Sequence, residues 1–259
     1  MSEVGNQVAR PEGNFSFVPA HGTYSRDVLP HDGYQIVHAT FALPMPLVTS
    51  FDAIKTHLRG LGRPIQALCG MELRIPNALG FQEFGDFNLQ YVKLLDTHNL
   101  RIGTGSDTKA TMTRTNVAPE TAAAKPIESS VFAFSYVVPG SRTSGRKSFV
   151  CSGSGELTGN TRDSIVALSD VSPSGLQEKA RWVMQMYAAR LLSLGLSWQD
   201  ATTINLYCVH SPNSFFEQEI LSVMGSSASL GVHWHYARPP VLDIEFEADV
   251  RGTALELYI

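Results

Sequence analysis

The chain has 259 residues, of which 43% are hydrophobic and 17% charged, and its formal net charge is −4 at pH 7. It can bury one large hydrophobic core or two smaller ones, and its scattered basic residues argue against a nucleic-acid partner or an anionic membrane. No apolar run reaches the roughly 20 residues that cross a bilayer, and residues 1–16 lack the pattern of a signal peptide, so we expect a cytoplasmic protein.

The first half of the chain alternates predicted strands and helices. After a polar stretch over residues 1–16, which we expect to be a flexible arm, strands are predicted over residues 33–43, 67–75, 111–117 and 130–138. Two helices lie between them. Their apolar residues recur every three or four positions: Phe51, Ile54, Leu58 and Leu61 in the first, and Phe84, Phe87, Tyr91 and Leu94 in the second.

The second half shows a similar order. A hairpin is predicted over residues 131–157, followed by a helix with an apolar stripe from Leu176 to Leu191 and by a strand that ends near Cys208. A short helix then ends before Gly225. The last two strands flank the turn at Pro239 and Pro240.

Residues 61–75 and 194–208 match each other without a gap. The pairs Leu61/Leu194, Gly62/Gly195, Gln66/Gln199 and Leu73/Leu206 are identical. Chance similarity of two helix–turn–strand segments is the alternative to a duplication. We predict an α+β fold of two tandem β-β-α-β-α-β-β units, over residues 17–128 and 129–259, with helices on one face of mostly antiparallel sheets.

Two histidines are the best candidates for a metal site. His233 and His235 alternate along a predicted strand and could face the same side. No third ligand stands at a recognisable spacing, so we expect no metal and assign His233 to the wall of a substrate pocket.

Several short motifs occur in an order that resembles the RidA (YjgF) superfamily of enamine and imine deaminases. They are SFVCSGSGEL, the helix–turn–strand of residues 176–209 and ARPPVLDIEFEA in the second half, with FQEFGDFNLQYVKLL and TRTNV in the first. The resemblance implies RidA-like, chorismate-mutase-like units, of which the first is degenerate. A tandem chain of this length is similar to the 2-aminomuconate deaminases of aromatic-compound degradation.

This resemblance implies a set of site residues. Arg114 would bind a substrate carboxylate, helped by the backbone of Asn116, and Glu245 would activate water. The other expected contacts are Tyr136 as a lid, Ser152 and Gly153. Glu247 shares the parity of Glu245 in a predicted strand, so it is the alternative base if the register slips by two residues.

The resemblance also implies a function. The expected substrate is a small dicarboxylate of the 2-aminomuconate type, such as 2-amino-5-chloromuconate, hydrolysed to a 2-oxo acid and ammonia without a cofactor. Two departures, Gly231 in place of a second arginine and no acid in residues 131–138, indicate either one composite site between units or a second site that has decayed. We therefore expect an oligomer, with a trimer favoured. A broad enamine/imine hydrolase and a non-catalytic small-molecule-binding protein are the alternatives.

Overall fold

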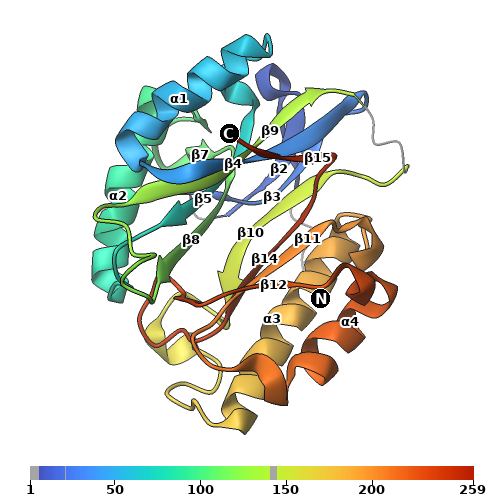
Figure 1. Ribbon diagram of the computed structural model, residues 1–259. Coiled ribbons are helices and arrows are strands. Elements are labelled where there is room, and N and C mark those ends of the chain that lie inside the picture. Colours follow the sequence, from blue (N-terminus) through green and yellow to red (C-terminus); the bar gives the residue numbers. More distant parts are fainter. Residues whose placement is uncertain (1–5, 21, 141–144) are drawn as a thin grey trace.

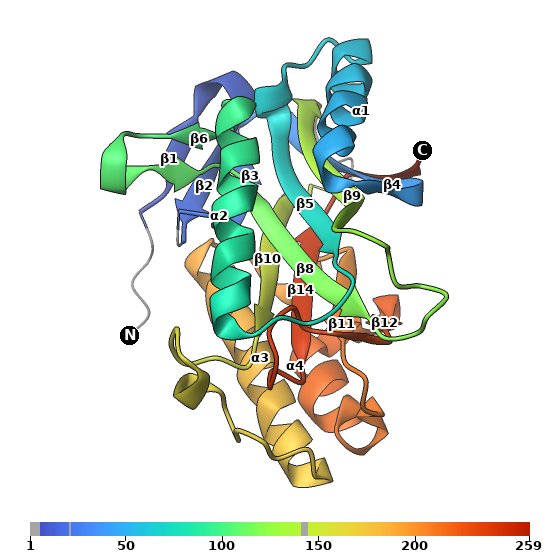
Figure 2. The ribbon, with the colours of Figure 1, turned by 90° about the vertical axis from the view of Figure 1, so that its left-hand side faces the viewer.

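The computed structural model describes residues 6–20, 22–140 and 145–259, and in this part of the chain two β-sheets pack face to face with helices outside them (Figures 1 and 2). The six-stranded sheet has the order β13 (Ala237–Arg238), β8 (Thr113–Pro119), β5 (Leu68–Arg74), β9 (Ser130–Pro139), β4 (Tyr34–Pro46), β15 (Leu255–Tyr258). The seven-stranded sheet has the order β1 (Val8–Arg10), β2 (Phe15–Pro19), β3 (Ser25–Pro30), β10 (Phe149–Gly155), β14 (Glu247–Gly252), β11 (Thr203–Tyr207), β12 (His233–His235).

Helices cover only the outer face of each sheet, as predicted. Helices α1 (Leu47–Gly60) and α2 (Phe81–Thr97) pack on the six-stranded sheet, and α3 (Pro173–Ser193) and the short α4 (Ser222–Met224) on the seven-stranded one (Figure 1). A π-helical turn, Phe216–Leu221, precedes α4, and a small ribbon joins β6 (Arg101–Ile102) to β7 (Lys109–Ala110). The described strand pairs are antiparallel except β5/β8, β11/β12 and β4/β15. The predicted α+β class with mostly antiparallel sheets is confirmed.

The two matching segments follow the same local path. Each leaves its helix through a glycine with positive φ, +67° at Gly62 and +68° at Gly195, which a residue with a side chain adopts at a cost. Each then makes a 3₁₀ turn, Ile65–Ala67 or Trp198–Asp200, and enters a buried strand, β5 or β11.

Sheet membership does not follow the predicted boundary at residues 128/129. The expected hairpin over residues 131–157 is wrong, because β9 lies between β4 and β5 while β10 pairs with β3 and β14 in the other sheet. Strands from both ends of the chain therefore contribute to both sheets. The division into two tandem units remains a prediction.

The expected flexible arm is also wrong from Val8 onward. Strand β1 pairs with β2, and the Arg10 guanidinium donates a hydrogen bond to the Asn99 carbonyl at 2.7 Å. Val8 packs against the cluster that contains Phe15 and Phe17. These tertiary contacts order a segment whose own composition is polar; residues 1–5 of the predicted arm lie outside the described residues.

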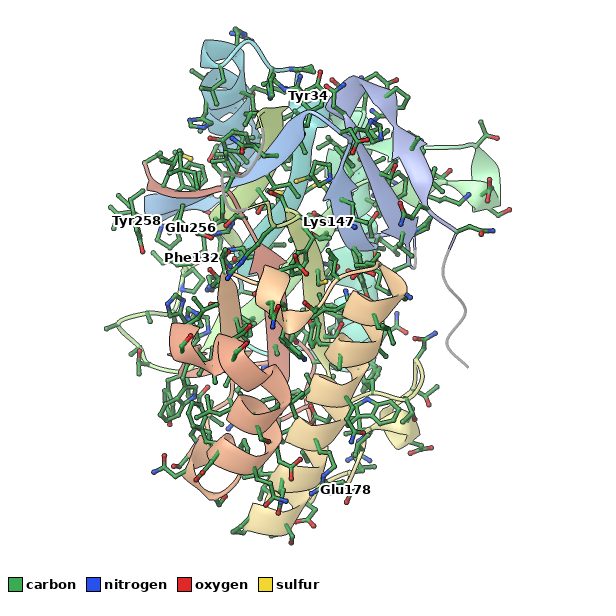
Figure 3. All side chains as sticks on the ribbon, turned by 90° about the vertical axis from the view of Figure 1, so that its right-hand side faces the viewer. Tyr34, Phe132, Lys147, Glu178, Glu256 and Tyr258 are labelled. Atoms are coloured by element: carbon green, nitrogen blue, oxygen red, sulfur yellow. The ribbon has the colours of Figure 1, made fainter. Side chains whose placement is uncertain are left out.

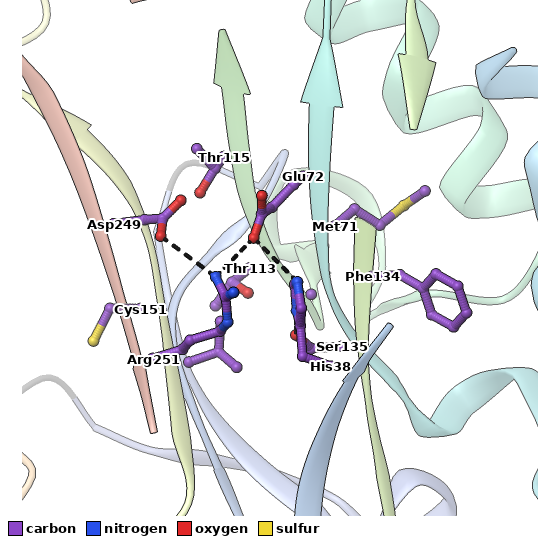
Figure 4. A pocket seen from close by; sticks show the side chains of 12 residues that line it. His38, Met71, Glu72, Thr113, Thr115, Phe134, Ser135, Cys151, Asp249 and Arg251 are labelled. Carbon is purple, nitrogen blue, oxygen red and sulfur yellow. Dashed lines mark hydrogen bonds and ion pairs between the residues drawn. The ribbon is translucent and has the colours of Figure 1, made fainter. Parts of the chain in front are cut away.

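A buried polar cluster lies between the two sheets (Figure 4). Arg251 of β14 donates a hydrogen bond from Nη1 to Glu72 Oε1 of β5 at 3.0 Å, and His38 Nε2 lies 3.5 Å from the same oxygen. Burial lowers the pKa of His38 to about 3, so its ring is neutral at pH 7. Charged groups thus join the sheets here, whereas apolar residues such as Phe17, Val28 and Cys69 form a separate cluster.

Candidate functional site

A cavity of ≈ 330 Å³ opens beside β8, where this strand packs near β10 and the start of β14. In Figure 2, β8, β10 and β14 lie between α2 and α3. The residues that line the cavity include Tyr24, Arg114, Asn116, Gly153, Ser154 and Glu247. The structure therefore brings Arg114, Asn116 and Gly153, three of the residues expected at the site, to one cavity.

Arg114 is held among aromatic rings. Its Cζ lies 4.8 Å from the ring centroid of Tyr91, 5.2 Å from that of Tyr24 and 5.4 Å from that of Phe84. The guanidinium therefore has aromatic neighbours at cation–π distance from two segments of the chain. The side chain is buried, and its Nη1 has no hydrogen-bond partner among the described residues.

Burial also affects the electrostatics of this arginine. It lowers the pKa of Arg114, while Tyr91, Tyr24 and Glu247 act in the opposite direction. An arginine stays charged even so, because a guanidinium is not deprotonated in proteins. An anion that enters the cavity would therefore meet a partly desolvated cation with a donor to spare.

Asn116 adds a second unpaired group. It lies two residues beyond Arg114 on β8, so the two side chains project from the same side of the strand. Both its Nδ2 and its Oδ1 are buried without a partner among the described residues. Buried polar atoms are nearly always hydrogen-bonded in proteins, which marks this position as one that a ligand would complete.

Glu247 supplies the acid of the cavity. It is the first residue of β14 and is buried. Burial raises the pKa of Glu247 well above its ordinary value, and the nearby carboxylates of Asp249 and Glu156 raise it further, while Arg114 and Arg74 lower it. A carboxyl whose pKa is raised by burial beside a cation is a candidate for general acid–base catalysis.

Gly153 makes room for this carboxylate. A Cβ at position 153 would collide with Glu247 Oε1 and lie 2.9 Å from Thr115 Cγ2. The Gly153 amide donates a hydrogen bond to Thr115 Oγ1 at 3.0 Å. The bare backbone of β10 thus lets β8 and Glu247 approach each other.

Ser152 lies next to Gly153 but turns away from the carboxylate. Its hydroxyl donates to the carbonyl of Ser25, and its own carbonyl accepts a hydrogen bond from the Tyr187 hydroxyl at 2.7 Å. The side chain lines a neighbouring cavity of ≈ 500 Å³ instead. Ser152 is consequently better placed to align β10 with β3 than to touch a ligand beside Glu247.

The structure places Glu247, the alternative acid, at the cavity instead of Glu245. The Glu245 side chain does not line the cavity; its Oε2 lies 2.8 Å from His210 Nε2 and 3.3 Å from Arg238 Nη1. The parity argument failed because β14 begins only at Glu247, so Glu245 lies outside the strand in which side chains alternate.

Two other expected contacts lie elsewhere. The Tyr136 hydroxyl lies 2.9 Å from His57 Nε2, on the face of the six-stranded sheet that α1 covers, and burial raises the pKa of Tyr136 to about 12. His233 is exposed on β12, at the edge of the other sheet. Neither residue lines the cavity, because Tyr136 packs with the residues of α1 and β12 lies at the far edge of the seven-stranded sheet.

Sequence reasoning missed the aromatic residues around Arg114. Phe84 and Tyr91 were predicted only as the packing face of a helix, and Tyr24 lies in a polar stretch with no periodic signal. His235, the other candidate metal ligand, lies with Nε2 3.2 Å from Asn205 Oδ1. Within residues 6–20, 22–140 and 145–259, no three His, Cys, Asp or Glu side chains come together as metal ligands would.

Comparison with known proteins identifies the family. The model of the family "2-aminomuconate deaminase CnbZ" matches residues 7–257. This chain belongs to that family. The 2-amino-5-chloromuconate deaminase of Comamonas testosteroni is 39% identical to this chain over 247 residues. The match covers 94% of this chain and 95% of the relative. The resemblance to 2-aminomuconate deaminases is confirmed.

Some solved structures are more distantly similar to this chain. A chorismatase is 12% identical with a TM-score of 0.48, and the match covers 96% of this chain and 79% of the chorismatase. An L-PSP protein of Entamoeba histolytica, described as a putative endoribonuclease, is 16% identical with a TM-score of 0.33, over 41% of this chain and 79% of its own. No helix in the described part of the chain has the length and apolar character of a membrane span.

Proposed function

We propose that this chain hydrolyses the imine tautomer of a 2-aminomuconate-type dicarboxylate, such as 2-amino-5-chloromuconate, to the 2-oxo acid and ammonia. The observation that carries the proposal is the shared cavity of Arg114, Asn116 and Glu247, in which a cation and an amide have unpaired polar atoms next to a carboxyl of raised pKa. Membership of the 2-aminomuconate deaminase family supports the same chemistry.

Arg114 would hold the carboxylate beside the reacting carbon. A guanidinium offers two parallel N–H donors that match the two oxygens of a carboxylate, and the unpaired Nη1 is one of them. The amide of Asn116 would add a hydrogen bond to the same end of the substrate. The rings of Tyr24, Phe84 and Tyr91 keep Arg114 in place and limit access of bulk water to it.

Glu247 would move the protons. In its ionised form, Glu247 accepts a proton from a water molecule whose oxygen adds to the imine carbon, and passes that proton to the imine nitrogen, which gives a neutral tetrahedral carbinolamine. The carbon–nitrogen bond then breaks as a carbonyl forms, and Glu247 transfers the hydroxyl proton of the carbinolamine to the departing nitrogen. The balance is one imine and one water consumed, and one 2-oxo acid and one ammonia formed, with Glu247 unchanged.

The proposal is tested by Arg114→Lys. Lysine keeps the charge but loses the planar fork, so we expect kcat/KM for ammonia release from 2-aminomuconate to fall at least about tenfold, since a hydrogen bond to a charged group contributes about 1.5–3 kcal/mol. Arg59→Lys on the exposed side of α1 is the matched control and should keep full activity. Unchanged kinetics of the Arg114→Lys protein would show that the carboxylate binds elsewhere.

A further inference from the structure

A second cavity of ≈ 500 Å³ adjoins the one that contains Arg114. The two share Tyr24, Ser154 and Met186 in their walls. The second cavity extends over one side of α3 and reaches Arg26 on β3. The two cavities therefore adjoin at Tyr24, Ser154 and Met186.

Two arginines and one aspartate stand at the inner end of this second cavity. Arg190 is fully engaged: its Nε and Nη2 donate to Asp27 Oδ1 at 2.9 and 2.6 Å, and its Nη1 donates to Ser154 Oγ at 2.9 Å. Burial acts to raise the pKa of Asp27, but Arg190 and Arg26 outweigh it and hold that pKa below its ordinary value. These three side chains together carry one surplus positive charge.

The surplus lies on Arg26. Its Nε donates to Asp27 Oδ2 at 2.6 Å, but its Nη2 is buried and has no hydrogen-bond partner among the described residues. The side chain keeps 29% of its surface exposed, toward the cavity that it lines. A buried donor without a partner costs free energy that an incoming acceptor would recover.

We propose that Arg26 binds the second carboxylate of the dicarboxylate substrate, the one distant from the reacting carbon. This proposal rests on the proposed function, because Arg114 must hold the first carboxylate. The path between the two arginines passes the ring of Tyr24 and the side chain of Met186, which suit the apolar diene chain that joins the carboxylates of a muconate. Arg26 is accordingly a specificity-determining residue that selects dicarboxylates over monocarboxylates.

The test uses two inert ligands with the same carbon chain. Muconate has a carboxylate at each end, whereas sorbate (hexa-2,4-dienoate) lacks the second one. We expect the wild-type protein to bind muconate more tightly than sorbate in calorimetric titrations. Arg26→Gln should weaken muconate binding at least about tenfold and leave sorbate binding unchanged, since only muconate offers a charged acceptor to Arg26.

Three controls make the result interpretable. Asp27 keeps its bonds from Arg190 in the Arg26→Gln protein, so we expect an intact fold, to be verified by thermal melting. Arg59→Gln on α1 should bind both ligands as the wild type does. Arg114→Gln should weaken both ligands, because each has the first carboxylate.

The proposal is overturned if the wild type does not prefer muconate, if Arg26→Gln binds muconate normally, or if it loses affinity for both ligands equally. The proposed function is tested separately. Absence of ammonia release from 2-aminomuconate by the wild type would refute the deaminase function even where muconate binding depends on Arg26.

Discussion

A single glutamate, Glu247, connects the electrostatics of the site with its expected chemistry. It faces the cavity that also contains Arg114, whereas Glu245, two residues earlier, lies against His210 and Arg238. The two acids have the same side chain and nearly the same place in the sequence. They therefore form a matched pair in which only the environment differs.

Glu247→Gln should abolish most turnover. Glutamine keeps the shape of the side chain but cannot accept a proton from water, so we expect kcat for ammonia release to fall by about 10²–10⁴ with little change in muconate affinity. Glu245→Gln is the control and should retain kcat. The reverse pattern, an inactive Glu245→Gln protein beside an active Glu247→Gln protein, would show that Glu245 is the base, as the sequence favoured. Full activity of both variants would support the alternative of a non-catalytic binding protein.

The raised pKa of Glu247 also makes stability depend on pH. Above the ordinary glutamate pKa of about 4.3, the unfolded chain loses this proton while the folded protein retains it, so the wild type loses stability as the pH rises toward the folded-state pKa. The Glu247→Gln protein has no titrating carboxyl at this position, so it lacks this pH-dependent loss of stability. We expect its free energy of unfolding, relative to the wild type, to increase from acidic to neutral pH in urea titrations.

A suitable comparison for that measurement is Glu178→Gln, since Glu178 is exposed on α3 (Figure 3). The free energy of unfolding of Glu178→Gln, relative to the wild type, should not increase from acidic to neutral pH. A stability difference for Glu247→Gln that is constant over the same pH range would mean that Glu247 is ionised in the folded protein throughout.

At the scale of elements, Arg251 makes ion pairs that join the two sheets. Its Nη1 lies 3.0 Å from Glu72 Oε1 of β5, and its Nε lies 3.0 Å from Glu256 Oε1 of β15, so one residue of β14 binds two strands of the opposite sheet. Figure 4 shows Glu72 and Asp249 on either side of the guanidinium. These carboxylates would repel each other in a buried space without it.

Arg251→Gln should therefore destabilise the fold by about 3–5 kcal/mol, the usual loss when one partner of a buried ion pair is removed. Chemical denaturation measures this loss. Lys109→Gln is the control, because its ion pair with Asp107, at 2.5 Å, lies at the surface and such pairs contribute about 0–1 kcal/mol. An equally small loss for Arg251→Gln would show that the sheets are joined by apolar packing alone.

Elements with local signals were predictable from the sequence, and their partners were not. The apolar faces of α1, α2 and α3 follow from residues such as Phe51, Tyr91 and Tyr187, because helical spacing places them on one side. Nothing local says that β9 joins β4 and β5 while β10 joins β3. Strand partners are set by tertiary packing, as is the ordering of Val8–Arg10.

The candidate site shows the same division. Family motifs placed Arg114 and Gly153 at the site, and the structure brings both to one cavity. The motif around Glu245 did not keep the expected alternation, because Glu245 precedes the first residue of β14. Tyr24 and Arg26 could not be found from sequence, since their contribution depends on β3 lying beside β10.

For the whole molecule, the structure changes the reason to expect an oligomer. Arg114, Gly153 and Glu247 meet within one chain, so a second copy is not needed to bring these three residues together. A different feature now supports association. Large apolar side chains stand exposed near the C-terminus and the β4–α1 junction: Leu43 at 81%, Val48 at 65% and Tyr258 at 85%, the last projecting from the edge strand β15 (Figure 3).

We predict that this apolar edge mediates self-association, with a trimer still the favoured state. Monomers rarely leave such side chains grouped in water, and an edge strand has backbone groups that a second copy can pair. Multi-angle light scattering at micromolar concentration should give a mass above that of one 28.3 kDa chain. Tyr258→Lys combined with Leu43→Glu should shift the protein toward the monomer while ammonia release is retained, because neither residue lines the cavity of Arg114. A wild-type protein that is monomeric throughout, or a double variant of unchanged mass, would mean that this edge is not the interface.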